Sequence, residues 1–214
     1  MKLEKNKIVV IPAYNELPSL KILTKILKNK KIPFLILNDG SNDGTLGWLK
    51  QNKIKFINNK INLGYEKNLL IGFKKILKSR KYKYIFTFDG DGQHRVNDIL
   101  KLEKSKYYTK YDMVVCNRNQ LNRFSENILS FFFNLIFGIK DPLTGFKIYK
   151  ISFLKENLKL VSENNFLIEL INLGKKRNYK ISNFKIISKP RKHSRIGDNI
   201  FIHLKILRCL KFIF

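Results

Sequence analysis

Two carboxylates separated by a single glycine, Asp89 and Asp91, are the residues of this sequence best suited to chemistry. They follow an apolar run, so we expect them at the end of a strand, where Gly90 allows the backbone to approach a ligand. Paired carboxylates are the oxygen ligands that Mg²⁺ and Mn²⁺ prefer, often shared with substrate phosphates. The same residue types also form simple turns, so this pattern alone leaves a metal site and a turn as equal alternatives.

Polar residues next to this pair, and at a second predicted strand end, extend the candidate site. Gln93 and His94 follow directly and add an amide and an imidazole that could ligate a metal or orient the carboxylates. Asp39 lies in the run Asn38–Ser41 and supplies a further acceptor. Its alternative role is an Asx turn that begins the next helix.

The elements that must position these residues alternate between strands and helices in the first half of the chain. Short apolar runs predict strands at 7–11, 33–37, 54–57 and 83–88, and helical spacing predicts helices at 17–28, 42–51 and 65–78. This alternation indicates βαβ units and an α/β fold with a mainly parallel sheet. Ligands of such sheets bind beyond the carboxyl ends of the strands, which here carry residues 12–16, 39–41 and 89–93.

The second half of the chain is less regular. We expect strands at 113–116 and 179–187, a turn at 141–146, a helix at 166–173 and a basic loop at 189–195. The apolar segment 128–139 is too short to cross a bilayer, so we expect a buried helix, with a membrane contact as the alternative. No internal repeat or linker divides the chain.

Composition excludes several classes of protein. Hydrophobic residues make up 44% of the 214 residues, which is ample for a core and argues against intrinsic disorder. Two cysteines are too few for a disulfide framework, and we expect neither a signal peptide nor a membrane-spanning helix. The net charge of +27 indicates either a heavily solvated lysine-rich surface or an anionic partner: nucleic acid, a membrane surface or a phosphate-bearing substrate.

Five segments resemble, in order and spacing, the motifs of family-2 glycosyltransferases, and the resemblance covers about residues 7–197. They are Ile11–Glu16, Asn38–Ser41, Asn62–Gly64, Asp89–His94 and Asp141–Phe146. The last segment resembles an element of the branch that contains dolichol- and polyprenyl-phosphate sugar synthases. The resemblance implies a GT-A fold, a nucleotide-sugar donor, a divalent metal ion (Mg²⁺ or Mn²⁺) and inversion at the anomeric carbon.

The resemblance also implies roles for individual residues. Asp89 and Asp91 match the two acids of the family's D-x-D motif, with Asp91 as the main metal ligand and Gln93 as a second one. The positions that match the family's donor site are Pro12, Tyr14, Glu16, Asp39 and Asp89. Gly90, between the two acids, belongs to the same site. Basic residues for the acceptor or its phosphate are Arg118, Arg123, Arg191 and Arg195. Around Arg191 and Arg195 the family's glycine and spacing are missing, so structural ion pairs are an equal alternative there.

The charge of the reactants constrains the mechanism. A departing nucleoside diphosphate needs positive charge, which a metal ion at Asp91 would supply, with Lys67 or Arg195 adding to it. A lipid phosphate is already an anionic nucleophile and needs no strong general base, only charge-assisted positioning. A saccharide hydroxyl does need a base, for which Asp141 and Glu169 are candidates. A helix cap or a surface charge is the alternative role for both.

Residues 199–214 predict a C-terminal amphipathic helix. Its basic face carries Lys205, Arg208 and Lys211, and its apolar face carries Ile202, Ile206, Cys209 and Ile213. A basic stripe beside an apolar stripe is typical of an interfacial helix on anionic lipid. The equal alternative is a helix that packs on the core while its lysines reach solvent.

We therefore expect a metal-dependent hexosyltransferase with a GT-A domain at 1–197 and the amphipathic helix at 198–214. Its expected substrates are a UDP- or GDP-linked sugar and polyprenyl phosphate, and its expected location is the cytoplasmic face of a membrane, as a peripheral protein on anionic lipid. The alternative acceptor is a saccharide hydroxyl in envelope polysaccharide or glycolipid synthesis. A basic nucleic-acid-binding protein is the rival from another class, but no recognisable nucleic-acid motif supports it, so we expect no nucleic-acid partner.

Overall fold

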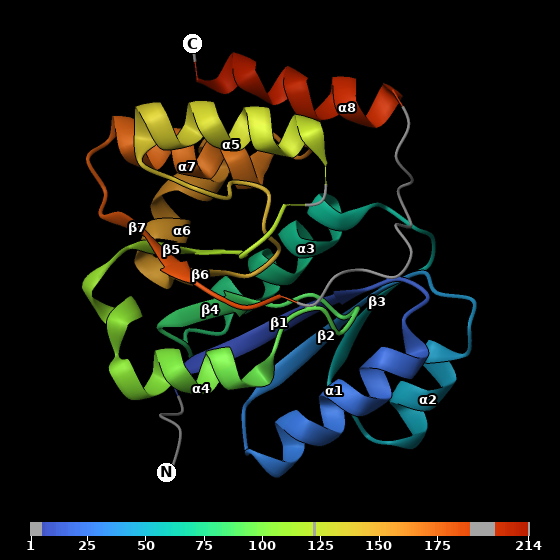
Figure 1. Ribbon diagram of the computed structural model, residues 1–214. Coiled ribbons are helices and arrows are strands. Elements are labelled where there is room, and N and C mark those ends of the chain that lie inside the picture. Colours follow the sequence, from blue (N-terminus) through green and yellow to red (C-terminus); the bar gives the residue numbers. More distant parts are fainter. Residues whose placement is uncertain (1–5, 122, 189–199, 214) are drawn as a thin grey trace.

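A seven-stranded sheet forms the centre of the protein, as seen in a computed structural model that describes residues 6–121, 123–188 and 200–213 (Figure 1). The strand order is β3-β2-β1-β4-β6-β5-β7. Strand β6 is antiparallel to β4 and β5, whereas all other neighbours are parallel, so the expected mainly parallel α/β sheet is confirmed. The strands are β1 (Lys7–Ala13), β2 (Phe34–Asp39), β3 (Phe56–Asn59), β4 (Tyr84–Thr87), β5 (Met113–Asn117), β6 (Lys147–Lys150) and β7 (Ile181–Lys185).

Helices cover both faces of this sheet. Figure 1 shows α1, α2 and α4 on one face and α3, α5, α6, α7 and α8 on the other. The α-helices are α1 (Leu17–Asn29), α2 (Thr45–Gln51), α3 (Tyr65–Lys78), α4 (Val96–Ser105), α5 (Phe124–Phe137), α6 (Ile151–Asn157), α7 (Phe166–Lys176) and α8 (Ile200–Leu207). Short 3₁₀ helices are η1 (Tyr107–Lys110), η2 (Leu158–Leu160) and η3 (Arg208–Phe212).

Two hydrophobic cores lie on the two sides of the sheet, because successive strand residues point to opposite faces. In β1, Ile8 and Val10 join the core under α3, α5, α6 and α7, whereas Val9 and Ile11 join the core under α1, α2 and α4. A strand that is buried on both faces is apolar throughout, which explains the continuous apolar run in this part of the sequence.

The expected apolar helix at 128–139 is the larger part of α5, but only one side of that helix is buried. Leu129 and Phe133 belong to the core, whereas Phe131 and Leu135 are more than half exposed. The expectation of a buried helix is therefore correct for the inner side alone. Helix α5 begins at Phe124 and ends before Gly138, whose positive φ of 68° closes the helix.

The C-terminal segment packs against the rest of the protein. Cys209 and Ile213 are buried in the core that α7 also lines, and Ile206 is partly buried against it. For this apolar face the core-packing alternative is therefore correct. The expected boundary at 197/198 falls outside the described residues. Among the helices that the structure describes, none has both the length and the apolar character needed to cross a membrane.

Candidate functional site

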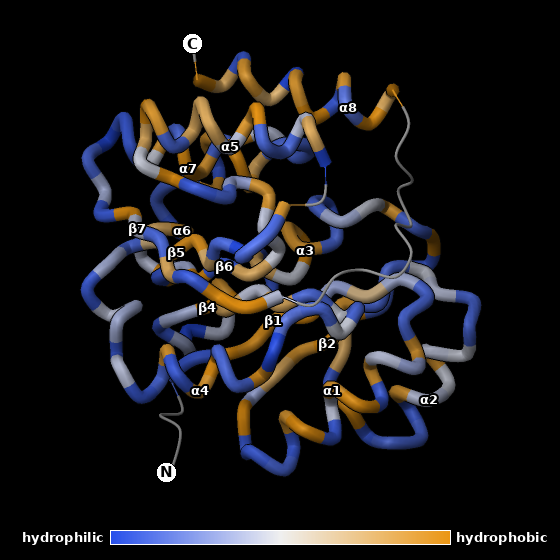
Figure 2. The backbone as a smooth tube through the Cα atoms, viewed as in Figure 1, coloured by the Kyte–Doolittle hydropathy of each residue, from blue (hydrophilic) through white to orange (hydrophobic). Residues whose placement is uncertain are grey.

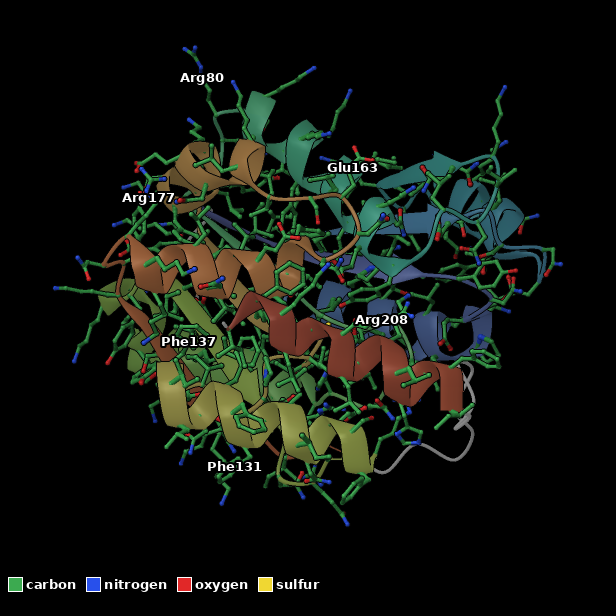
Figure 3. The ribbon with its side chains drawn as sticks, turned by 90° about the horizontal axis from the view of Figure 1, so that it is seen from above. Arg80, Phe131, Phe137, Glu163, Arg177 and Arg208 are labelled. Carbon is green, nitrogen blue, oxygen red and sulfur yellow. The ribbon has the colours of Figure 1, made fainter. Side chains whose placement is uncertain are left out.

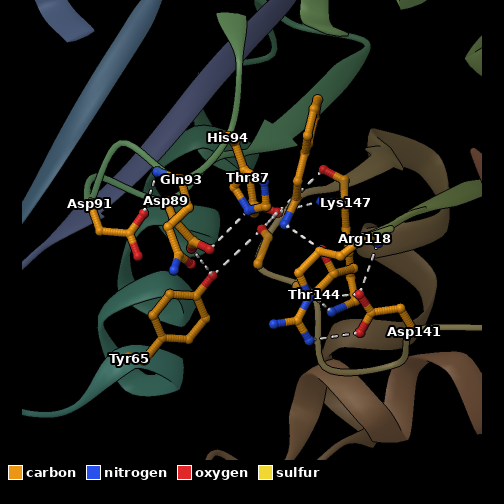
Figure 4. A network of polar contacts seen from close by, with 12 residues as sticks. Tyr65, Thr87, Asp89, Asp91, Gln93, His94, Arg118, Asp141, Thr144 and Lys147 are labelled. Atoms are coloured by element: carbon orange, nitrogen blue, oxygen red, sulfur yellow. Dashed lines mark hydrogen bonds and ion pairs between the residues drawn. The ribbon is translucent and has the colours of Figure 1, made fainter. Parts of the chain in front are cut away.

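The carboxylates predicted to bind a metal lie directly after β4. Asp89, Asp91 and Gln93 are each partly exposed, and Figure 4 shows their side chains pointing to the same side, towards Tyr65. The hydroxyl of Tyr65 donates a hydrogen bond to Asp89 Oδ1 at 2.9 Å, and His94 Nε2 lies 3.1 Å from Asp89 Oδ2. Burial alone would raise the pKa of Asp89, but these two contacts and the charge of Arg118 hold that pKa below its usual value. Asp89 is therefore ready to bind a cation as a carboxylate.

The loop between α5 and β6 forms the opposite wall of this site. A Cβ atom on Gly145 would overlap both carboxylate oxygens of Asp89, so any larger residue would have to displace that carboxylate or the loop. Thr87 of β4 fixes the loop: its hydroxyl donates to the carbonyl of Gly145 at 2.7 Å and accepts the N–H of Lys147 at 3.0 Å (Figure 4). The Thr144-Gly145-Phe146 segment therefore packs directly against the carboxylate of Asp89, the first acid of the metal motif.

Arg118 and Asp141 form a buried, bidentate ion pair beside these carboxylates. Arg118 donates to Asp141 through Nε at 2.8 Å, through Nη2 at 3.0 Å and through its backbone N–H at 3.1 Å. Burial would lower the pKa of Arg118, but Asp141 and then Glu126 raise it above its ordinary value, so the guanidinium stays charged. Asp141 is only 1% exposed. In this arrangement its carboxylate positions Arg118.

Glu126, in the first turn of α5, connects two of the predicted acceptor residues. Its Oε2 lies 3.1 Å from Arg118 Nη2 and its Oε1 lies 2.8 Å from Arg123 Nη1. Glu126 is itself buried. The structure thus brings Arg118 and Arg123 together through a residue that the sequence did not single out. Arg191 and Arg195 lie outside the described residues.

The predicted donor residues lie at the neighbouring ends of β1 and β2. Pro12 is buried, Tyr14 is 37% exposed and Glu16 is partly exposed. The two loops are joined by hydrogen bonds, from the Asn15 N–H to Ser41 Oγ at 3.0 Å and from the Asn42 N–H to Asn15 Oδ1 at 2.9 Å. These loops therefore hold one another in place at the carboxyl edge of the sheet.

Asp39 fixes the loop that leads into α3. Its buried carboxylate accepts hydrogen bonds from the N–H groups of Leu63 at 3.0 Å and Gly64 at 2.9 Å, and from Asn59 Nδ2 at 2.8 Å. The loop passes so close to Gly40 that a Cβ atom there would lie 2.6 Å from the carbonyl carbon of Ile61. Asp39 thereby sets the position of the first turn of α3, which carries Tyr65 and the exposed Lys67.

Gly90, in the loop after β4, lies close to the end of β1. A Cβ atom at this position would lie 3.1 Å from the carbonyl oxygen of Pro12. The glycine between the two acids therefore allows the donor loop after β1 to pack directly against the metal motif.

Several residues of the site were missed by sequence reasoning. Tyr65 directly follows the Asn62–Gly64 motif and Lys147 directly follows the Thr144–Phe146 motif, so adjacency to a motif is the only signal that pointed to them. Lys147 is buried and donates from Nζ to the carbonyl of Thr144. Burial lowers its pKa to about 8, although the carboxylates of Asp141, Glu66 and Asp89 oppose this effect. The loop is thus held by a buried lysine whose pKa lies below its usual value.

Glu169, the other candidate for a general base, has a different surrounding. It lies on α7 and accepts a hydrogen bond from the backbone N–H of Ser162 at 2.7 Å, in addition to one from that residue's hydroxyl. These contacts are those of a carboxylate that fixes the loop before α7.

The residues after β4 fit a hard divalent cation. Asp89, Asp91 and Gln93 offer carboxylate and amide oxygens, the ligands that such cations prefer. Among those described residues, no three His, Cys, Asp or Glu side chains are grouped to hold a metal by themselves. Two carboxylates and an amide suit Mg²⁺ or Mn²⁺ sites, which often use one or two carboxylates and complete the coordination with water and substrate phosphates.

Comparisons with known proteins agree with this arrangement. Residues 8–141 match the model of Glycosyl transferase family 2. An uncharacterised protein of Methanocaldococcus jannaschii is 34% identical over 168 residues, which cover 70% of this chain and 73% of that protein.

Two solved structures are similar in fold. Glucosyl-3-phosphoglycerate synthase from Mycobacterium tuberculosis, in complex with Mn²⁺, UDP and glucosyl-3-phosphoglycerate, has a TM-score of 0.72 at 12% identity, covering 98% of this chain and 80% of that one. Mannosyl-3-phosphoglycerate synthase from Rubrobacter xylanophilus has a TM-score of 0.60 at 12% identity. The likeness covers 96% of this chain and 71% of that one. At this identity the likeness concerns the fold, and it confirms the expected GT-A architecture.

Proposed function

Since the chain belongs to glycosyl transferase family 2 and is a glycosyltransferase, we propose that it moves a hexose from a nucleoside-diphosphate sugar to a polyprenyl phosphate, with inversion at the anomeric carbon. One observation carries this proposal. A charged guanidinium, Arg118, is held by Asp141 and Glu126. Figure 4 shows Arg118 and Asp141 beside the carboxylates that follow β4. Cation-binding and anion-binding groups thus lie next to each other, as transfer between two phosphate-bearing substrates requires.

The donor half of the site is assigned to the ends of β1, β2 and β4. Asp91, with Gln93 and Asp89, would hold Mg²⁺ or Mn²⁺, which supplies a Lewis acid for the diphosphate leaving group. Tyr65 and His94 orient the Asp89 carboxylate, and the exposed Lys67 adds positive charge at the first turn of α3. The Mn²⁺ and UDP in the complex of the Mycobacterium tuberculosis synthase support a metal-assisted donor of this class.

The acceptor half is assigned to Arg118 and Arg123. A phosphate oxygen is already a nucleophile, so these guanidinium groups need only orient it by charge-assisted hydrogen bonds. A hydroxyl acceptor would need a base, but the Asp141 carboxylate is buried and accepts three hydrogen bonds from Arg118. This engagement favours the phosphate acceptor over a saccharide hydroxyl. A polyprenyl acceptor would also place the enzyme, as a peripheral protein, at the cytoplasmic face of a membrane.

Thermal unfolding with nucleotides tests the donor site. UDP, GDP, dTDP and CDP are each added with Mn²⁺, because a ligand that binds only the folded protein raises its apparent stability. We expect one nucleotide to raise the melting temperature, and we expect chelator or Asp91→Asn to abolish that rise. Glu163→Gln is the matched control, since this carboxylate is exposed and lies 3.7 Å from Lys74 at the surface. If the melting temperature of the Asp91→Asn variant rises as much as that of the original chain, Asp91 does not hold the metal ion.

Transfer of labelled sugar tests the acceptor. The protein is incubated with the nucleotide sugar identified by thermal shift, Mn²⁺ and polyprenyl phosphate, and products are separated into organic and aqueous phases. We expect an acid-labile lipid-linked sugar that is lost in Arg118→Gln while the nucleotide-induced thermal shift persists. Label found only on a water-soluble saccharide or phosphorylated acceptor, with none in the lipid phase, would overturn the polyprenyl proposal and keep the donor site.

A further inference from the structure

An apolar surface spans the outer sides of α5 and α8. Figure 2 shows both helices rich in hydrophobic residues at the edge of the molecule, and Figure 3 shows Phe131 on the outer side of α5. Phe124 and Phe201 are 75% and 77% exposed. The surface, called the α5/α8 surface below, consists of Phe124, Phe131, Leu135, Ile136, Ile200, Phe201 and Leu204. Soluble proteins rarely expose so many large apolar side chains together unless they bind something there.

The two helices pack against each other beneath this surface. His203 Nδ1 lies 2.8 Å from Ser125 Oγ, which joins their first turns. Their inner sides are anchored by Leu129 and Phe133 of α5 and by Cys209 of η3, all buried in the same core. The outer apolar residues are therefore additional to those that the fold needs for its own packing.

The charge around this surface is positive. Residues 200–213 contain no acidic residue, and Lys205, Arg208 and Lys211 are exposed. The single acid of α5, Glu126, is buried and paired with Arg118 and Arg123. An occupant of this surface must therefore offer both apolar contact and negative charge.

We propose that the α5/α8 surface docks on an anionic lipid bilayer, with its phenylalanine and leucine side chains inserted at the interface and the basic residues of α8 and η3 contacting head groups. Partial insertion of apolar side chains and attraction of lysine and arginine to anionic lipid are the two contributions that hold peripheral proteins on membranes. A second copy of the chain is a poorer occupant, because each copy carries a net charge of +27 and would bring the same cations face to face.

The docking surface is directly connected to the acceptor residues. Phe124 lies two positions before Glu126, and Glu126 holds both Arg118 and Arg123. A bilayer in contact with the first turn of α5 would therefore lie next to these guanidinium groups, where a lipid phosphate could reach them. This last connection rests on the proposed function, whereas docking itself does not.

Vesicle sedimentation without substrates tests the proposal. The full chain is mixed with vesicles of phosphatidylcholine and phosphatidylglycerol, or of phosphatidylcholine alone. We expect binding to the anionic vesicles, reduced about tenfold by Phe124→Ser/Phe131→Ser and by Phe201→Ser/Leu204→Ser. Ile22→Ser and Ile61→Ser are matched controls, since both residues are exposed elsewhere on the protein. A cooperative thermal unfolding transition of every variant, followed by circular dichroism without any ligand, verifies the fold.

A charge series separates docking from unspecific attraction. Lys205→Gln/Arg208→Gln/Lys211→Gln is compared with Lys21→Gln/Lys25→Gln/Lys28→Gln, three exposed lysines on α1. We expect only the first set to weaken binding. Equal loss in both sets, or unchanged binding in the phenylalanine variants, would overturn the proposal. Light scattering that shows a dimer abolished by the same phenylalanine variants, without vesicle binding by the original chain, would assign the surface to self-association instead.

Discussion

Asp89 is the residue at which two distant parts of the chain meet the loop after β4. Tyr65 comes from the first turn of α3, His94 from the loop after β4 and Gly145 from the loop before β6, and all three contact its carboxylate or leave it room. The contacts fix both the direction and the charge of this group before any ligand arrives. Pre-organisation of this kind removes the cost of ordering a site during binding.

Gly145→Ala tests this crowding. The added methyl group would overlap the Asp89 carboxylate, so that either the loop or the carboxylate must move. We expect unfolding to become easier by about 1–3 kcal/mol and the metal-dependent nucleotide shift to be lost. Gly47→Ala is the control: no atom lies within 4 Å of its Cβ position, and on α2 alanine should stabilise by roughly 0.5–1 kcal/mol. A full nucleotide shift in the Gly145 variant would contradict this account.

We expect Glu66 and Lys147 to make the stability of the folded protein depend on pH in two separate ranges. Burial raises the pKa of Glu66 to about 7, against the N–H of Leu167 and the charges of Lys147 and Lys205. The folded state therefore holds a proton that the unfolded state releases, and stability falls as pH rises from about 4.5 to about 7. Burial lowers the pKa of Lys147 to about 8, so stability rises again above that pH, towards the ordinary lysine pKa.

Denaturant unfolding across pH 5 to 9 checks this prediction. We expect Glu66→Gln to remove the decline below pH 7, an effect of roughly 3 kcal/mol at most, and to leave the rise above pH 8. Lys147→Met should remove the rise in stability above pH 8 and leave the decline below pH 7. Parallel pH profiles for the original chain and Glu66→Gln would show that Glu66 is not protonated in the folded state.

At the scale of elements, α5 combines a structural and a functional task. Its inner side fills the core, its first turn holds the arginine residues through Glu126, and its outer side is exposed and apolar. These tasks occupy different faces of the same helix, so a substitution on one face can change one task alone. Acidic residues in the first turn of a helix are also favoured by its dipole.

Glu126→Gln should separate acceptor positioning from donor binding. The amide keeps the shape of the side chain but removes the charge that holds Arg118 and Arg123. We expect kcat/KM for the acceptor to fall about tenfold, while the nucleotide-induced thermal shift stays unchanged. Glu163→Gln again serves as the control. If the nucleotide shift falls together with acceptor turnover, Glu126 supports the whole site rather than its acceptor half.

The strands and helices of the first half could be predicted because their signals are local. A strand buried on both faces is a continuous apolar run, and a helix with one buried face, such as α3, has apolar residues at helical spacing. Both patterns can be recognised within a short stretch of sequence. Helices α4 and α6 and strand β6 were not predicted from the sequence. Strand β6 has only four residues with a lysine at each end, and it becomes a strand by pairing with β4 and β5, which come from distant parts of the chain.

The candidate site could be predicted as a set of loops but not as a set of contacts. Position at a strand end identified Asp39, Asp89 and Asp91, since the carboxyl ends of parallel strands share one edge of the sheet. Pairs such as Tyr65 with Asp89, or Glu126 with Arg118, depend on how separate elements pack together. No spacing in the sequence encodes such contacts.

At the scale of the whole molecule, the charge of +27 should attract nucleic acid without recognising it. Lysine-phosphate contacts of this kind release counterions and weaken steeply with salt. We expect any complex with duplex DNA to disappear between about 50 and 200 mM salt. Docking on anionic vesicles should decline less, because its apolar contribution does not depend on salt. Electrophoretic mobility shift and vesicle sedimentation across one salt series compare the two, and a salt-resistant DNA complex would revive the nucleic-acid hypothesis.

The antiparallel strand β6 has a consequence for how the chain is made. Strands β1 to β4 are neighbours in the sheet and are synthesised first, so this half can assemble while the ribosome is still translating. Strand β5 cannot join them, because its link to β4 is β6, which follows about thirty residues later in the sequence. Until residue 150 has left the ribosome, β5 has an open edge on the side that β6 will occupy, and a nascent chain paused there would be the form most exposed to aggregation.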